Sequence, residues 1–124
     1  MERSIRELVQ KEQETCWLFV YGTLKRGNRR SLDKMYKDVK FLIEIILCDY
    51  TLYKMPFRNV PVMVPAPGKK VVGELWKIPV SLLDTLDKRE GVAKGWYTRR
   101  RMGAFYVYLW EHTTLFFRHL GERF

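Results

Sequence analysis

Short apolar runs, separated by glycines, prolines and charged residues, divide this chain into elements of limited length. Most of these runs are rich in β-branched and aromatic residues or alternate with polar ones, which is typical of strands. Interruptions indicate a break near Cys48–Asp49, a bulge or close backbone approach at Gly73, and a tight turn at Met102–Gly103. The strands predicted in this way lie within residues 17–20, 39–53, 70–78 and 96–110.

Helical patterns occupy three segments. The first is a charged stretch in which Ser4 and Glu7 have the spacing of a capping box. The last has Ser81 as a candidate cap and Gly91 just beyond its end, where a left-handed residue is common. The predicted helices lie within residues 3–14, 31–37 and 79–90.

The remaining segments are harder to place. Four prolines between Met55 and Gly68 exclude a helix and predict a loop that flanks a short edge strand around Val62–Val64. After Glu111, the apolar run 115–117 favours burial, whereas residues 121–124 do not. Antiparallel strands with few helices predict an α+β fold, with a curled sheet or a small barrel. We expect one domain over residues 1–124, with a helical extension at 1–15, a core at 16–110 and a tail at 111–124.

Composition narrows the class of protein. Hydrophobic residues make up 47% of the 124-residue chain and aromatic residues 15%, which predicts a packed globule rather than a disordered chain. No apolar stretch is long enough to span a membrane, and the N-terminus lacks the apolar region of an export signal, so we expect a cytoplasmic protein with no membrane partner. Cys16 and Cys48 are interpreted as reduced, buried thiols. His112 and His119 lack zinc-ligand spacing, so no metal or other cofactor is expected.

An acidic residue within the predicted helix 79–90 is the first candidate for catalysis. At about 100° per residue, Leu82, Leu83 and Leu86 define an apolar arc from about 0° to 100°, and Glu90 falls at about 80°. Asp87 falls at the edge of this arc. A carboxylate on a buried face is costly unless it is paired or protonated, and burial raises its pKa toward a range suited to proton transfer. The alternative is a structural role, in which Glu90 caps a loop amide or pairs with an arginine of the 99–100 pair.

The loop at residues 21–27 is the second candidate. Gly22 and Gly27 bracket it, and consecutive turn amides in such a loop can form an anion-binding nest. The order of a Walker phosphate-binding loop is absent, because Asn28 follows Gly27. A plain turn between a strand and a helix remains the alternative. No serine or cysteine lies in a recognisable nucleophile motif.

Several blocks of sequence together resemble the γ-glutamyl cyclotransferase-like family, which includes γ-glutamylamine cyclotransferases and AIG2-like proteins. The similarity is specific because the blocks occur in the family's order and cover about residues 17–110. The blocks are Phe19-Val20-Tyr21-Gly22-Thr23-Leu24-Lys25-Arg26-Gly27, Val72-Gly73-Glu74-Leu75-Trp76, Leu86-Asp87 with Glu90-Gly91, Tyr97-Thr98-Arg99, and Ala104-Phe105-Tyr106-Val107-Tyr108.

The resemblance implies a fold, a reaction and a site. The fold is a small mixed β-barrel with flanking helices, and the reaction converts a γ-glutamyl amine or amino acid into 5-oxoproline and a free amine. The resemblance implies that Glu90 is the catalytic acid and base, and that the partner is a γ-glutamyl compound or another small carboxylate. It also implies substrate contacts from Tyr21, Gly22, Thr23 and Leu24; we further expect Tyr97 or Tyr108 to form a wall of the cavity.

The net charge of +9 leaves a second interpretation open. Basic clusters such as Arg99–Arg101, together with the aromatic content, suit a non-enzymatic member of the same fold that binds an acidic small molecule or nucleic acid. Arg99 and Arg101 would point to one face of a strand and Arg100 to the other, so these charges need not form one patch. The enzyme therefore ranks above nucleic-acid binding.

Overall fold

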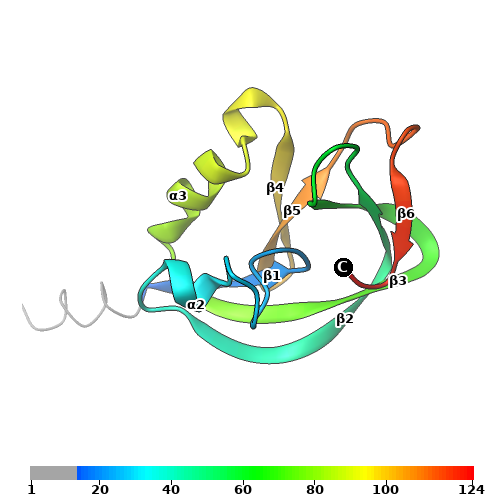
Figure 1. Ribbon diagram of the computed structural model, residues 1–124. Coiled ribbons are helices and arrows are strands. Elements are labelled where there is room, and N and C mark those ends of the chain that lie inside the picture. Colours follow the sequence, from blue (N-terminus) through cyan, green and yellow to red (C-terminus); the bar gives the residue numbers. More distant parts are fainter. Residues whose placement is uncertain (1–13) are drawn as a thin grey trace, which may run out of the picture.

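A computed structural model describes residues 14–124. In this part of the chain, a six-stranded sheet of order β4-β5-β1-β3-β2-β6 is accompanied by two α-helices and one 3-10 helix (Figure 1). The pairing of β1 with β5 is parallel, and the other pairings are antiparallel. The elements are β1 (Thr15–Val20), α2 (Leu32–Met35), β2 (Lys40–Lys54), β3 (Pro61–Pro79), α3 (Leu82–Arg89), η1 (Val92–Lys94), β4 (Tyr97–Met102), β5 (Phe105–Trp110) and β6 (Arg118–Gly121).

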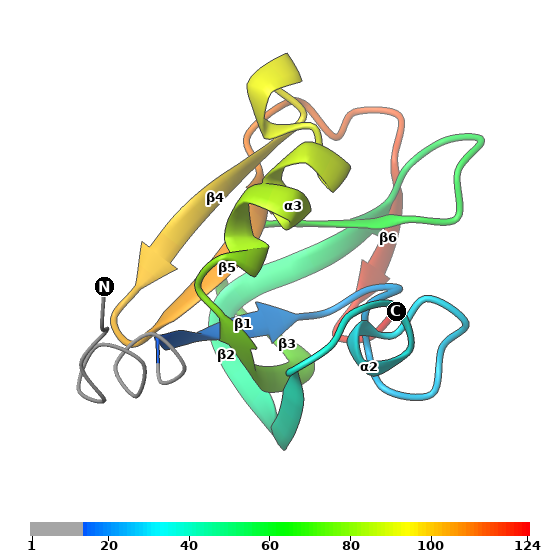
Figure 2. The same cartoon turned by 90° about the vertical axis from the view of Figure 1, so that its left-hand side faces the viewer.

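The α+β class with a mixed sheet and flanking helices is confirmed, and of the two predicted forms, a curled sheet or a small barrel, the curled sheet is present. Within residues 14–124 the edge strands β4 and β6 pair only with β5 and β2, so the sheet curls without closing. Figure 2 shows α3 in front of β5, with β1 below the helix in this view.

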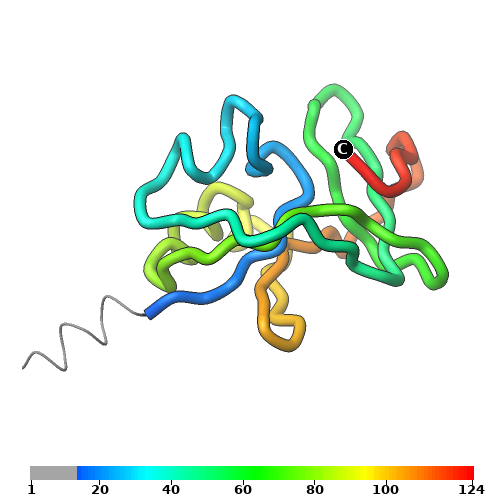
Figure 3. Tube along the Cα trace, turned by 90° about the horizontal axis from the view of Figure 1, so that it is seen from below, coloured from blue at the N-terminus to red at the C-terminus, as the bar shows by residue number. Residues whose placement is uncertain are grey.

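The long ribbon formed by β2 and β3 gives the sheet its curvature. Its register shifts between Cys48 and Tyr50, where Asp49 has a positive φ of 70°, as expected from the predicted break. The strand predicted around Val62–Val64 is present but longer, since β3 runs from Pro61, and only the loop predicted after it, up to Gly68, is wrong. Its prolines are tolerated because β1 pairs with β3 only from Glu74 onward, which leaves one side of the earlier part free of that partner. Figure 3 shows the 21–36 segment and the 55–60 loop rising on the same side of this ribbon.

Close packing of β1 against β3 explains Gly73. A Cβ atom built on Gly73 would lie 2.5 Å from the Phe19 ring and 2.6 Å from the Val20 carbonyl oxygen. The predicted close approach of the backbone is therefore present. Leu18 and Trp76, which face each other across these strands, are almost fully buried and anchor the larger part of the core.

The helix predicted for residues 79–90 is present as α3. Leu83 and Leu86 are buried, and Gly91 has φ 66° in the left-handed region that ends the helix. The predicted cap is wrong, because Ser81 itself has helical dihedral angles and its side chain makes no capping hydrogen bond.

Predictions about the cysteines and the tail need correction, and one about the N-terminus lies almost wholly outside the described residues. Cys16 and Cys48 are free thiols, but Cys16 is only partly buried and Cys48 is exposed. In the tail, Phe116 is exposed, whereas β6 joins the sheet and the Val72 amide donates to the Glu122 carbonyl. Backbone hydrogen bonds, which composition does not reveal, therefore hold this end. The N-terminal helix predicted at 3–14 lies, apart from residue 14, outside the described residues.

Candidate functional site

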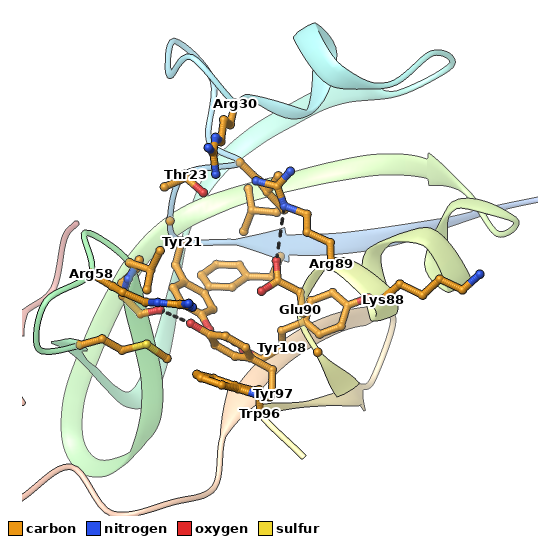
Figure 4. Close-up of a pocket in the computed structure, with 18 of the residues that line it drawn as sticks. Tyr21, Thr23, Arg30, Arg58, Lys88, Arg89, Glu90, Trp96, Tyr97 and Tyr108 are labelled. Atoms are coloured by element: carbon orange, nitrogen blue, oxygen red, sulfur yellow. Dashed lines mark hydrogen bonds and ion pairs between the residues drawn. The ribbon is translucent and has the colours of Figure 1, made fainter. Parts of the chain in front are cut away.

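A cavity of about 380 Å³ opens between the loop after β1, the loop between β2 and β3, and the end of α3 (Figure 4). Its lining residues include one group from the 21–24 segment and another from the end of α3, β4 and β5. All seven residues proposed from the sequence line it: Tyr21, Gly22, Thr23, Leu24, Glu90, Tyr97 and Tyr108. Segments far apart in the chain thus meet at one site.

Glu90 lies where α3 ends. Its amide donates to the Leu86 carbonyl, so it lies one helical turn beyond the buried Leu86 and just past the edge of the core. Its side chain is 20% exposed, and Oε1 lies 3.9 Å from Arg89 Nε. Burial raises the pKa of Glu90, and the positive charge of Arg89 partly offsets this rise. The alternative pairing with the 99–100 arginines is wrong, because those arginines bind other acids.

The two halves of the 21–27 loop differ in whether their backbone amides already have hydrogen-bond partners. In the second half, the Arg26 amide donates to Glu74 Oε1 at 2.7 Å, so this half already binds an internal anion. In the first half, the amides of Gly22, Thr23 and Leu24 donate to no group within residues 14–124. The Leu24 side chain packs in the core, and all three residues line the cavity. Backbone donors without a partner in this part of the chain therefore belong to residues of the cavity wall.

Three buried tyrosines present hydrogen-bond acceptors, in contrast to the donor amides of the loop. The hydroxyl of Tyr21 donates to the Tyr108 carbonyl at 2.5 Å, and that of Tyr97 donates to the Pro61 carbonyl at 2.7 Å. The Tyr108 hydroxyl donates to Asp87 Oδ1 at 2.7 Å. Burial raises the pKa of all three phenols, so they stay protonated at neutral pH. Each phenol has a single proton, so these hydroxyls can offer a ligand only acceptor lone pairs.

Asp87, which the helical wheel left at the edge of the apolar arc, contacts a residue of the cavity wall. Besides accepting from Tyr108, it pairs through Oδ2 with Arg99 Nη1 at 3.0 Å. This contact links α3 to β4 and β5 and fixes the Tyr108 ring at the cavity. The pairing would be detectable in sequence only by matching the helix to the β4–β5 hairpin.

Basic side chains around the cavity were also missed by sequence reasoning. Arg30, Arg58 and Arg89 line it, together with Lys88 and Lys94, against a single acid, Glu90. These residues come from separate loops and from the end of α3, so no local pattern links them. By contrast, the 99–101 run that suggested nucleic acid is largely paired: Arg99 with Asp87 and Arg100 with Glu111, while Arg101 donates to the Gly103 carbonyl.

Two classes of site find no support in the described part of the chain. Among residues 14–124, no group of three or more His, Cys, Asp or Glu side chains is arranged to hold a metal ion. Across the same residues, no helix combines the length and apolar character needed to cross a bilayer.

Comparison with known proteins agrees with this geometry. The family model described as "Gamma-glutamyl cyclotransferase, AIG2-like" matches residues 18–119, which include every cavity residue discussed above. The chain belongs to this family. An Arabidopsis thaliana protein named "Putative gamma-glutamylcyclotransferase" is 35% identical over 97 residues, which cover 69% of this chain. The chain spans about half, 49%, of the length of that relative.

Solved structures of the family share the fold. A mouse AIG2-like protein superposes with a TM-score of 0.68 at 24% identity, over 87% of this chain and 87% of that one. A gamma-glutamyl cyclotransferase structure gives 0.65 at 20% identity, over 87% of this chain and 70% of that one. At these identities the likeness concerns the fold alone. Family membership supports a cyclotransferase-like function.

Proposed function

We propose that this protein is a γ-glutamyl cyclotransferase that uses Glu90 as its only proton-transferring side chain. The observation that supports this most is the position of Glu90. Its carboxylate lies partly buried in a cavity, with a raised pKa, opposite free backbone donors at residues 22–24. The Glu90 carboxylate makes no hydrogen bond within residues 14–124, so it is available to a substrate.

The two sides of the cavity suit the head of an amino acid. Backbone amides at residues 22–24 are donors and match an α-carboxylate. The hydroxyls of Tyr97 and Tyr108 already donate elsewhere and offer only acceptors, which match an α-ammonium group. Donors on one side and acceptors on the other thus orient a γ-glutamyl group in one direction.

The reaction would be an intramolecular acyl transfer. Glu90 takes a proton from the α-ammonium of the substrate, and the freed amine attacks the γ-carbonyl carbon to close a five-membered ring. The nucleophile is tethered to its target, so correct positioning alone supplies a large part of the rate. Loop amides that approach the developing oxyanion would lower the barrier further.

Collapse of the tetrahedral intermediate completes the transfer. Glu90 gives its proton to the leaving nitrogen as the original amide bond breaks, and the ring nitrogen loses its second proton. The products are 5-oxoproline and the amine, which takes up that second proton and leaves as an ammonium ion. One carboxylate with a raised pKa serves as base and then as acid.

The test is direct measurement of 5-oxoproline. The purified full chain is incubated with a panel of γ-glutamyl amines and γ-glutamyl amino acids, and Glu90→Gln serves as the isosteric variant that cannot carry the proton. We expect turnover of at least one compound by the natural protein and its loss in the variant. Full turnover in Glu90→Gln would eliminate the role of Glu90, and no turnover of any compound would refute the activity.

A further inference from the structure

The most exposed large apolar side chains in the described part of the chain lie in two loops. Phe57 is 104% exposed in loop 55–60, between β2 and β3. Leu115 and Phe116 are 77% and 83% exposed in loop 111–117, between β5 and β6. Apolar side chains scattered singly over a surface are ordinary, whereas a contiguous group of them marks an interaction site. It therefore matters whether the two loops lie together.

The two loops rise at one end of the sheet. Lys54 and Arg118, which pair across β2 and β6, stand directly before the first loop and directly after the second. Figures 1 and 2 show both loops, in green and in orange, toward the top of the molecule. The Arg58 guanidinium carbon lies 5.4 Å from the centroid of the Trp96 ring, and that ring lies 6.4 Å from the ring of Trp110, just before the second loop. The two loops therefore form one surface, which we call the paired-loop surface.

Turns in the backbone hold the apolar side chains of this surface outward. The Phe117 amide donates to the Thr114 carbonyl at 2.9 Å, so Leu115 and Phe116 occupy the two corner positions of a turn. Phe57 has φ 62°, a left-handed conformation that is costly for a bulky aromatic residue. Such positions favour glycine, asparagine, aspartate and serine. Large apolar side chains that are exposed there contribute little to folding, which indicates that they contact a partner.

The paired-loop surface is also positively charged. Residues 54–60 and 112–121 contain three basic residues, Lys54, Arg58 and Arg118, and no acidic one. In the described part of the chain none of these three has a carboxylate within 4.0 Å. A second copy of the same surface would bring like charges together, which disfavours self-association through it. The partner that fits is negatively charged at its face and apolar beneath it.

We infer that the paired-loop surface binds the anionic face of a lipid bilayer. Phe57, Leu115 and Phe116 enter the boundary between headgroups and acyl chains, and the basic residues lie against the acidic headgroups. The expectation of no membrane partner rests on the lack of a spanning stretch, and binding at the surface of a bilayer needs none. Arg58 and Trp96 also line the cavity, so the bilayer would lie beside it, but the inference does not depend on the proposed reaction.

Single-stranded nucleic acid is the alternative partner with the same charge. Its bases stack on aromatic side chains along a basic groove. Leu115 offers no ring for stacking, and the complete exposure of Phe57 leaves no neighbour beside it to hold a base. A fluid bilayer accommodates all three protruding side chains, so the observations favour lipid.

Sedimentation with vesicles tests the binding. The purified full chain is mixed with vesicles of phosphatidylcholine alone, and with vesicles that contain about one-third phosphatidylserine. We expect at least about tenfold stronger binding to the anionic vesicles at low salt, and a loss of this preference as salt is added. No binding to the anionic vesicles at low salt would overturn the inference.

Variants assign the binding to the apolar side chains. Phe57→Asn suits the left-handed backbone and Phe116→Ser suits a turn corner, so the doubly substituted protein should fold, as thermal unfolding would verify. We expect its affinity for anionic vesicles to fall at least about tenfold. Ile43→Ser, which removes a 55% exposed side chain from β2 outside the two loops, is the matched control and should change little. Equal losses in both proteins would overturn the assignment to the loops.

A charge variant tests the same surface with its apolar side chains intact. Arg118→Gln should lower the affinity for anionic vesicles about fivefold, because each basic residue near such a surface adds about that factor. Arg101→Gln, an exposed arginine on β4 outside the two loops, is its control and should change little. Equal effects of the two substitutions would indicate attraction by overall charge alone and would overturn the proposed orientation.

The other partners give distinct results with the doubly substituted protein. Retention of the natural protein on single-stranded DNA that the double substitution abolishes, without vesicle binding, would assign the surface to nucleic acid. A dimer of the natural protein that the substitution dissociates in analytical ultracentrifugation, with vesicle binding unchanged, would assign it to contact between copies. Either result would overturn the lipid assignment.

Discussion

Two carboxylates adjoin the same glycine-bracketed loop and differ in almost every other respect. Glu74 is 6% exposed, and its Oε1 accepts from the Arg26 amide at 2.7 Å and from Trp76 Nε1 at 3.0 Å. Glu90 is more exposed, and its one ionic partner within residues 14–124 is the Arg89 guanidinium, at 3.9 Å. One oxygen of the first acid accepts two hydrogen bonds that hold the loop, whereas the second acid lines the same cavity as the loop and accepts none within residues 14–124. Hydrogen-bond occupancy, together with burial, distinguishes the structural acid from the proposed catalytic one.

The largest expected effect is a contrast in activity between the two acids. Glu90→Gln should lower kcat by at least about 100-fold, since general acid–base catalysis contributes about 10²–10⁴-fold. Glu74→Gln keeps an acceptor oxygen for both of its donors, so kcat should fall by less than about tenfold. Initial rates of 5-oxoproline formation at saturating substrate measure both. A larger loss in Glu74→Gln than in Glu90→Gln would reverse the assignment.

The loss of stability should be larger for substitution of Glu74 than for substitution of Glu90, the reverse of the order expected for activity. Glu74→Ala leaves the buried Trp76 Nε1 and the partly buried Arg26 amide without their acceptor, and a buried donor left unsatisfied costs about 1–3 kcal/mol. We expect the free energy of unfolding to fall by about 2–4 kcal/mol on this basis. Glu90→Ala removes no hydrogen bond and should change it by less than about 1 kcal/mol. Urea denaturation of both variants gives the two values, and similar losses would remove the distinction.

The same contrast explains what could be predicted from the sequence. Leu83 and Leu86 lie within one α-helix and Glu90 caps its C-terminal end, so a single helical period places all three on a shared face, and the structure agrees. The apolar run before Gly22 is likewise a local signal. The Arg26 amide that binds Glu74 and the Tyr108 hydroxyl that binds Asp87 come from other parts of the chain, so these contacts follow only from the packing of β1 against β3 and of α3 against β5.

Long-range pairing also explains the errors in the fold. Pro65 would break a central strand, but it lies opposite Tyr50 in a part of β3 that pairs with β2 and not with β1. Whether a curled sheet closes depends on contact between its two edges, and no residue pattern specifies that contact. Arg58 was missed for the same reason, because a loop residue becomes part of a cavity only when the β2–β3 ribbon curves.

A smaller effect is expected at the Tyr108–Asp87 contact. Tyr108→Phe removes an acceptor from the cavity and should raise KM about tenfold, equivalent to about 1.4 kcal/mol, with little change in kcat. Asp87→Asn keeps an acceptor for the Tyr108 hydroxyl but weakens the pairing with Arg99, so we expect about a threefold rise. Steady-state kinetics with the best substrate measure both. A fall in kcat with KM unchanged would instead place Tyr108 in the proton transfer.

The smallest expected effect is a pH-dependent difference in stability. Burial raises the pKa of Glu90 in the folded protein above its ordinary value of 4.5, so the folded state binds this proton more tightly than the unfolded state does. The contribution of Glu90 to the free energy of unfolding therefore falls as the pH rises from about that ordinary value through the raised pKa. Glu90→Gln has no such proton, and its stability relative to the natural protein should increase over this interval and then level off.

Urea denaturation of both proteins at a series of pH values tests this difference. Taking the difference between the two proteins cancels the contributions of the other titrating groups to the extent that the substitution leaves them unchanged. The interval should coincide with the acidic limb of the rate profile, because the base must be ionised to accept the α-ammonium proton. A stability difference that shrinks with rising pH would mean that the Glu90 carboxylate is stabilised by Arg89 more than it is destabilised by burial, and the cavity would then hold a permanent anion in place of a proton carrier.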